Sequence, residues 1–176
     1  IIEVIIENLD IKKSLYEKLE GKRKAGSVIS SNTSTIPLEK LIEGRGEEFQ
    51  KDFMITHFFN PPRYMKLLEL VVGEKTNQKS ADAIAEFCDY KLGKGIVRCN
   101  DRPGFIANRV GTFWLTRALK EVVDTNTPIE VADTMMSRPI GIPKTGVFGL
   151  MDLIGLDLLP LIAQSFADTL PADDEF

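Results

Sequence analysis

The sequence is poor in cysteine and histidine. Its 176 residues include two cysteines, Cys88 and Cys99, and one histidine, His57. Because there is no CxxC pair and no group of histidines near the cysteines, the sequence indicates neither a disulfide framework nor a metal site. Two isolated thiols are typical of a reducing compartment, so we expect the cytoplasm of a bacterium or the mitochondrial matrix.

Blocks of positive charge and long hydrophobic runs are also lacking. The chain has 22 Lys and Arg against 26 Asp and Glu, a net charge of −4, which argues against a nucleic-acid partner. The longest apolar stretch, residues 146–170, is interrupted at four positions by an acidic or amide side chain and is therefore not predicted to span a membrane. Those positions are Asp152, Asp157, Gln164 and Asp168. Small molecules or other proteins are the expected partners.

Residues 1–100 alternate between strand-like and helical patterns, which is typical of a parallel sheet covered by helices. Strands are predicted at residues 1–6, 28–30, 53–59, 66–72 and 96–99, and helices at about 11–20, 37–42 and 81–92. From residue 101 to 176 only helices are predicted: one of about twenty residues from 106, one at 128–136 and one from 157. Thr127–Glu130 forms a predicted capping box for the second, and Asp157 is the predicted cap of the third.

Polar residues follow three of the predicted strands: Glu7, then 31–34 (Ser-Asn-Thr-Ser), then His57 with Asn60. Ligands of open parallel sheets bind outside the carboxyl ends of the strands, so these residues are candidates for a binding site. The tetrapeptide by itself is explained more simply as a turn with local side-chain caps.

His57 and Glu69 are predicted to face each other. If the strands at 53–59 and 66–72 form a hairpin with its turn centred on Arg63, these two residues are directly opposite on one face, and Phe59 faces Leu67. A carboxylate beside an imidazole fixes its tautomer and stabilises its charged form, which suits a general base. A purely structural His–Glu bond is the equal alternative on spacing alone.

Four segments, in this order and spacing, resemble the NAD-dependent L-3-hydroxyacyl-CoA dehydrogenases of fatty-acid β-oxidation. They are SNTS at 31–34, HFFNP at 57–61, MKLLELV at 65–71 and DRPGFIANR at 101–109. The resemblance covers essentially the whole chain. It implies a Rossmann-type NAD-binding domain, here residues 1–100, followed by an all-helical domain, residues 101–176, that binds acyl-CoA and forms a homodimer.

The resemblance also implies roles for individual residues. His57 removes the proton of the substrate's 3-hydroxyl while hydride passes to NAD, and Glu69 orients it. Ser34 and Asn108 hydrogen-bond the 3-oxygen. Cofactor contacts are implied for Ser34 and three further residues, Glu7, Lys12 and Asn60. For Lys12 the alternative is an ordinary solvated charge on a helix.

Two features depart from the short dehydrogenases of this family. Residues 143–148 read PKTGVF where those enzymes tend to have PxGPF, a version similar to multifunctional bacterial proteins in which a hydratase follows the dehydrogenase. No GxGxxG is present, although such a loop holds the pyrophosphate of NAD. We therefore expect the chain to be a piece of a longer protein. The first βαβ unit of the Rossmann-type domain should be missing before residue 1, and the helical domain should lack its last element after residues 173–176.

Other interpretations remain open. The chain could be a non-catalytic binding or structural protein on the same scaffold, or a relative that acts on another hydroxy acid, against which HFFNP argues. Four side chains could line an acyl-binding pocket, but aromatic and Met residues at helical spacing more often belong to the hydrophobic core, so we assign them no role. They are Phe113, Trp114, Met135 and Met136.

Overall fold

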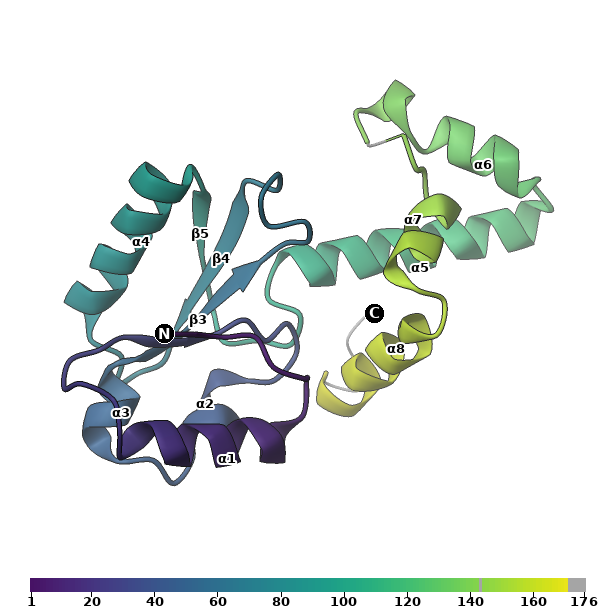
Figure 1. The fold of residues 1–176 in the computed structure, drawn as a ribbon. Helices are drawn as coiled ribbons and strands as arrows, with labels where there is room; N and C mark the ends of the chain where they lie inside the picture. Colours follow the sequence, from purple (N-terminus) through teal and green to yellow (C-terminus); the bar gives the residue numbers. More distant parts are fainter. Residues whose placement is uncertain (143, 171–176) are drawn as a thin grey trace. The chain divides into compact units, whose positions relative to one another are not determined.

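The computed structural model describes residues 1–142 and 144–170, which form two compact units, the first ending at Ile106 and the second beginning at Ala107 (Figure 1). The boundary lies six residues beyond the one expected from the sequence. Segment 101–106 belongs to the first unit because Asp101 accepts hydrogen bonds from Leu38 and Glu39, and the Ile106 N–H donates to Glu69.

The first unit contains a five-stranded sheet whose spatial order follows the chain. Its strands are β1 (Ile2–Glu3), β2 (Ile29–Ser31), β3 (Phe53–Phe58), β4 (Leu67–Val72) and β5 (Gly95–Cys99). All neighbours are parallel except β3 and β4, which form the predicted antiparallel hairpin. The α/β fold class predicted from the alternating pattern is therefore confirmed.

Helices cover both faces of this sheet (Figure 1). They are α1 (Leu9–Glu20), α2 (Leu38–Ile42), α3 (Glu47–Lys51) and α4 (Gln78–Leu92). Alternate residues of β3 point to opposite faces. Ile55 packs with side chains of α1 to α3, whereas Met54 packs with Ala81 and Cys88 of α4. Helix α3 was not predicted, because five residues are too few to show a helical period and, unlike α2, it does not start after a proline.

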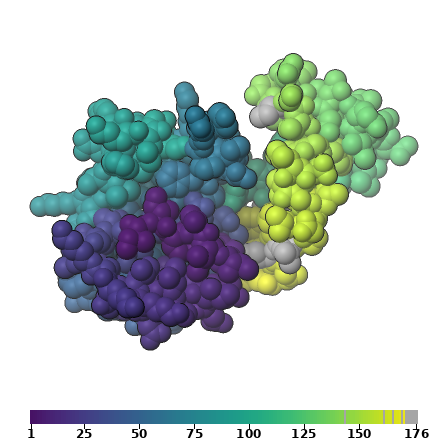
Figure 2. All heavy atoms as spheres, in the orientation of Figure 1, coloured from purple at the N-terminus to yellow at the C-terminus, as the bar shows by residue number. Residues whose placement is uncertain are grey.

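The prediction of a six-residue first strand was wrong. β1 has two residues, and Ile2, Val4 and Ile6 are exposed. In Figure 2 this N-terminal segment, in purple, lies on the outside of the first unit. The strand stops because the Glu3 carboxylate accepts a hydrogen bond from the Ile5 N–H at 2.7 Å, which turns the chain out of the sheet.

The second unit is helical, as predicted. Its helices are α5 (Ala107–Thr125), α6 (Ile129–Met135), the 3-10 helix η1 (Arg138–Ile140), α7 (Phe148–Ile154) and α8 (Leu158–Thr169). Its core joins Leu115 and Ala118 of α5 to Met151 of α7. Trp114, Met135 and Met136 line an apolar cavity of about 300 Å³.

Neither predicted N-cap forms a side-chain capping bond to its helix. Helix α6 starts after Pro128 without a side-chain cap, because the Thr127 hydroxyl is bonded to that of Thr125 at 2.7 Å. Asp157 stands at the N-cap of α8 but makes no capping bond. The Asp157 position was correct, the predicted N-cap at Thr127 was one residue too early, and both capping interactions were wrong.

Within residues 1–142 and 144–170, no single helix is long and apolar enough to cross a membrane. The bent pair formed by α7 and residues 158–168 meets that test only when the two are taken together. The same described residues contain no cluster of three His, Cys, Asp or Glu arranged to hold a metal ion. Residues 143 and 171–176, on which parts of the PKTGVF and tail predictions rest, lie outside the described residues.

Candidate active site

His57 and Glu69 form a buried hydrogen-bonded pair across the β3–β4 hairpin. They are register partners, as the hairpin argument predicted, and His57 Nδ1 lies 2.8 Å from Glu69 Oε2. His57 is 6% exposed and Glu69 is 1% exposed. A carboxylate accepts hydrogen bonds, so the Nδ1–H donates to Glu69, and Nε2 is left as the nitrogen that can accept a proton.

Aromatic rings and a backbone amide surround the pair. The imidazole centroid lies 4.5 Å from the ring of Phe59 and 5.7 Å from that of Phe105. The second carboxylate oxygen of Glu69 accepts the Ile106 N–H at 3.0 Å. Burial, together with the nearby Glu69 carboxylate, raises the pKa of the Cys99 thiol to about 11, so Cys99 is protonated at neutral pH.

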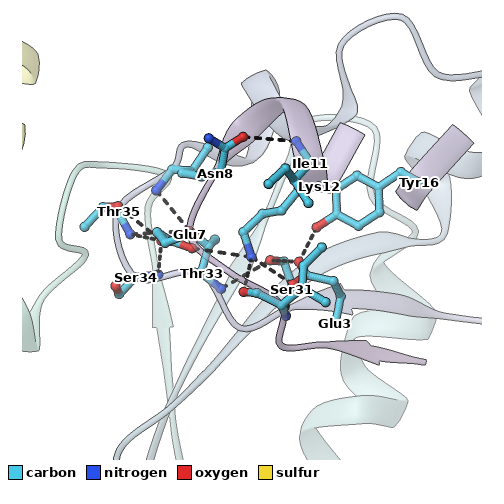
Figure 3. A network of polar contacts seen from close by, with 12 residues as sticks. Glu3, Glu7, Asn8, Ile11, Lys12, Tyr16, Ser31, Thr33, Ser34 and Thr35 are labelled. Carbon is cyan, nitrogen blue, oxygen red and sulfur yellow. Dashed lines mark hydrogen bonds and ion pairs between the residues drawn. The ribbon is translucent and has the colours of Figure 1, made fainter. Parts of the chain in front are cut away.

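Glu7 fastens the loop that carries Ser34 (Figure 3). Its Oε1 atom accepts the Thr33 hydroxyl at 2.5 Å, the Ser34 N–H at 3.0 Å and the Thr35 N–H at 3.2 Å. Burial alone would raise the pKa of Glu7, but these hydrogen bonds and the Lys12 charge outweigh it, so the pKa is lowered from 4.5. Glu7 is therefore ionised near neutral pH, and the 31–34 segment is more than a locally capped turn.

Beside this loop lies a buried polar network centred on Glu3 (Figure 3). The Glu3 carboxylate accepts hydrogen bonds from Lys12 Nζ at 2.8 Å, from the Tyr16 hydroxyl at 2.5 Å and from the Ser31 hydroxyl at 2.7 Å. Lys12 Nζ also lies 3.4 Å from Glu7 Oε2. The network links β1, α1 and the end of β2 to the Ser34 loop.

The structure corrects the alternative interpretation of Lys12 as a solvated helix charge, because Lys12 is 1% exposed. On the same helix, α1, Tyr16 is buried as well and Ile11 is exposed. An acidic residue within the apolar segment 1–6, with Lys and Tyr four residues apart on the next helix, was the signal that sequence reasoning missed.

The remaining predicted site residues are distributed over both units. Ser34 is half-buried and Asn60 is exposed, both in the first unit, while Asn108 is in the first turn of α5 in the second. Sequence reasoning gave no role to Asn32, whose Oδ1 accepts the Phe58 N–H at 2.9 Å and fastens the Ser34 loop to β3 beside His57.

Comparison with known protein families identifies the family to which the chain belongs. Residues 1–102 match the model described as 3-hydroxyacyl-CoA dehydrogenase, NAD binding domain, and residues 104–176 match the one described as 3-hydroxyacyl-CoA dehydrogenase, C-terminal domain. The chain belongs to the 3-hydroxyacyl-CoA dehydrogenase family. This confirms the resemblance predicted from the SNTS, HFFNP and PGFIANR segments, and it makes the first unit a member of an NAD-binding domain family.

Individual curated proteins are similar over the full length of this chain. A Rickettsia prowazekii protein named "Putative fatty acid oxidation complex trifunctional enzyme" is 44% identical over 176 residues, and a Deinococcus radiodurans "Probable 3-hydroxyacyl-CoA dehydrogenase" is 42% identical over 177. The chain spans 24% of the first protein and 51% of the second.

Among solved structures, the crystal structure of M. tuberculosis FadB2 matches 97% of this chain and 60% of its own, with a TM-score of 0.87 and 32% identity. The agreement confirms the Rossmann-type first unit and the helical second unit predicted from the sequence.

Proposed function

We propose that this chain contributes to the oxidation of L-3-hydroxyacyl-CoA to 3-ketoacyl-CoA with NAD, in fatty-acid β-oxidation. The observation that carries the proposal is the buried 2.8 Å bond between His57 Nδ1 and Glu69. Each side chain has its partner fixed by the hairpin register, and the pair lies near the loop that carries Ser34.

In the proposed reaction, His57 is the general base. Glu69 accepts the Nδ1–H and holds the neutral imidazole in the tautomer whose Nε2 can take the proton of the substrate's 3-hydroxyl. As the imidazole becomes charged, the Glu69 carboxylate stabilises it. NAD, when bound, supplies the acceptor for the hydride that leaves C3.

Ser34 and Asn108 are the proposed hydrogen-bond donors to the 3-oxygen of the substrate. Donors fixed before the reaction stabilise charge that develops on that oxygen. The Ser34 loop is fixed by Glu7 and Asn32, which accept hydrogen bonds from its backbone and from β3 respectively. Asn108 would act from the helical unit.

The residues present fit the nicotinamide end of NAD. Ser34, Asn60 and the partly exposed Glu7 carboxylate stand at the carboxyl ends of parallel strands or just beyond β3, where Rossmann-type sheets bind ligands. Lys12 is buried with its ammonium group on Glu3 and Glu7, so its proposed role is to position Glu7. No glycine loop for the pyrophosphate occurs in the 176 residues.

His57→Gln in the whole protein tests the proposal. NADH oxidation with acetoacetyl-CoA should fall by about 10²–10⁴-fold in kcat, since this is what a general base typically contributes. NADH affinity, measured by fluorescence titration, should stay within twofold of wild type. A His57→Gln protein with normal kcat would refute the assignment of the base, and an inactive wild type would favour the non-catalytic alternative.

Glu69→Gln tests the orienting role. It keeps the shape of the side chain but removes the charge, so kcat should fall at least about 10²-fold. Asp52→Asn is the matched control, because it breaks another buried ion pair, with Arg23 at 2.5 Å, at the opposite end of β3. The control should lower thermal stability without this loss of kcat. Equal kcat in the two variants would contradict the role of Glu69.

We also propose that the second unit binds the acyl-CoA and mediates homodimerisation, in the bacterial cytoplasm or the mitochondrial matrix. Large apolar side chains of this unit are exposed, including Val123, Met135 and Leu153. Exposed apolar surface of this kind marks interaction sites. Light scattering of the whole protein should give a dimer mass, and a monomer at micromolar concentration would contradict this part. The mitochondrial alternative for the location is supported by a mouse relative whose name includes the word "mitochondrial".

A further inference from the structure

The turn that ends the first unit has an uncommon backbone conformation. Phe105 has a φ of 47°, and Gly104 before it has a φ of 72°. Glycine adopts positive φ readily, but a bulky residue does so only under strain, and such strain persists where the surrounding structure maintains it. Strained residues of this type concentrate at functional sites.

This turn places an aromatic ring and a backbone N–H group against the His57–Glu69 pair. The Phe105 ring lies 5.7 Å from the His57 imidazole, tilted by 58°. The next residue, Ile106, donates its N–H to Glu69 Oε1 at 3.0 Å, while Glu69 Oε2 is bonded to His57. Two consecutive residues of one short turn thus contact the pair: Phe105 contacts His57, and Ile106 contacts Glu69.

The rest of the segment keeps the turn in place. At its beginning, the Asp101 carboxylate accepts the N–H groups of Leu38 and Glu39 at 2.9 and 3.3 Å. The Phe105 side chain is 5% exposed and belongs to the core cluster that contains Ile55 and Val71, the strand neighbours of His57 and Glu69. The strain at Phe105 is therefore offset by burial of its ring and by the bond to Glu69.

We propose that Phe105 is a positioning residue for the proposed reaction. Its ring restricts the rotation of the His57 imidazole, and its left-handed backbone directs the Ile106 N–H to Glu69. The carboxylate then stays in the orientation that accepts Nδ1–H, and Nε2 stays available as the base. The kinetic part rests on the proposed function, whereas the effect on the imidazole does not.

Phe105→Leu in the whole protein is the test, because it removes the ring and keeps a buried apolar side chain. Nitrogen NMR of His57, assigned by comparison with His57→Gln, reports which ring nitrogen carries the proton. Wild type should show the Nδ1–H form, and Phe105→Leu should show a mixture of both tautomers. We expect kcat to fall by about 10²-fold, as misplaced catalytic groups do, with KM for NADH within twofold.

Phe49→Leu is the matched control. Phe49 is 1% exposed in the same core cluster, and its aromatic contacts are with Tyr16 and Phe53. The control should lose similar thermal stability but keep the wild-type His57 signals and kcat. Phe105→Tyr, which retains a ring, should restore most of the kcat that Phe105→Leu loses.

Identical His57 signals in Phe105→Leu and Phe49→Leu would overturn the proposal, whatever the activity of the wild type. If Phe105→Leu fails to fold, Ile106→Pro decides instead, because it deletes the N–H that Glu69 Oε1 accepts, and a pure Nδ1–H form in that variant would also overturn it. A wild type without activity but with ring-dependent His57 signals would refute the proposed function and leave the positioning role supported.

Discussion

At the scale of single residues, Glu3 shows how a charge can be stable inside a core. It is 3% exposed, and its two oxygens accept hydrogen bonds from Lys12, Tyr16, Ser31 and the Ile5 backbone. Burial would raise the pKa of Glu3, but these bonds and the Lys12 charge outweigh it and lower the pKa from 4.5. The ionised form is therefore the stable one in the folded protein.

Glu3→Gln should destabilise the protein strongly. It leaves the Lys12 ammonium buried without its nearest carboxylate, and breaking a buried pair in this way costs about 3–5 kcal/mol in the free energy of unfolding. Urea denaturation at pH 7 measures this. Glu43→Gln, which breaks the exposed pair with Lys13, should leave the urea midpoint nearly unchanged. Equal midpoints for the two variants would contradict a stabilising role of the Glu3 network.

Acidification should destabilise the protein through Glu3 and Glu7. The folded pKa of each is below the unfolded value of about 4.5, so the folded state binds fewer protons than the unfolded state. The stability that the two ionised carboxylates contribute to the folded protein is fully present above the unfolded pKa. It is lost as pH falls through the lowered folded pKa. Urea midpoints from pH 7 to pH 3 should fall, and less steeply in Glu3→Gln. The same slope in both proteins would show that Glu3 does not contribute.

At the scale of elements, the structure explains the Thr-Gly-Val-Phe segment at 145–148, which the sequence offers only as a departure from a motif. The Asp133 carboxylate accepts the N–H groups of Phe148 and Gly149 at 2.7 and 3.0 Å and so caps α7 from α6. Gly146 has a φ of 67°, and a Cβ there would lie 2.6 Å from the Asp133 Cα. Glycine is therefore required for α6 and α7 to approach each other.

Gly146→Ala should lower the free energy of unfolding of the second unit, because both the positive φ and the contact with Asp133 oppose a side chain. Gly111→Ala is the matched control. Gly111 lies within α5, and a Cβ there meets nothing within 4 Å. The control should stabilise the protein by about 0.5–1 kcal/mol. Urea denaturation distinguishes the two, and equal effects would contradict this account of α7.

Predictability from sequence differed between elements. Strands β3 and β4 and helix α4 were predicted within three residues, because their apolar periods are long enough to be recognised. Helices α3 and α7 were not predicted, since five or seven residues hold too little periodicity and neither follows the proline that marked the equally short α2 and α6. Strand β1 was predicted too long, because a single carboxylate, that of Glu3, ends it.

At the scale of the whole molecule, the two units have separate cores. The first packs its sheet against α1 to α4, and the second packs α5 against α7. A core substitution in one unit should therefore have its main effect in that unit.

Met151→Ala should destabilise the second unit by about 2–5 kcal/mol, because it leaves a cavity beside Leu115. Amide hydrogen exchange should speed up in 107–170 and remain near wild type in β3 and β4. Leu70→Ala should show the reverse pattern. Uniform acceleration over both units in either variant would show that they unfold as one cooperative body.

The sequence by itself determined the fold class, the family and the pairing of His57 with Glu69. It could do so because strand alternation and the turn between two adjacent strands fix the register locally. The tertiary structure alone decided what holds that pair and the Ser34 loop. The Ile106 bond to Glu69 and the Ser31 bond to Glu3 join residues 37 and 28 positions apart, and no local pattern records which distant groups a fold brings within hydrogen-bond distance.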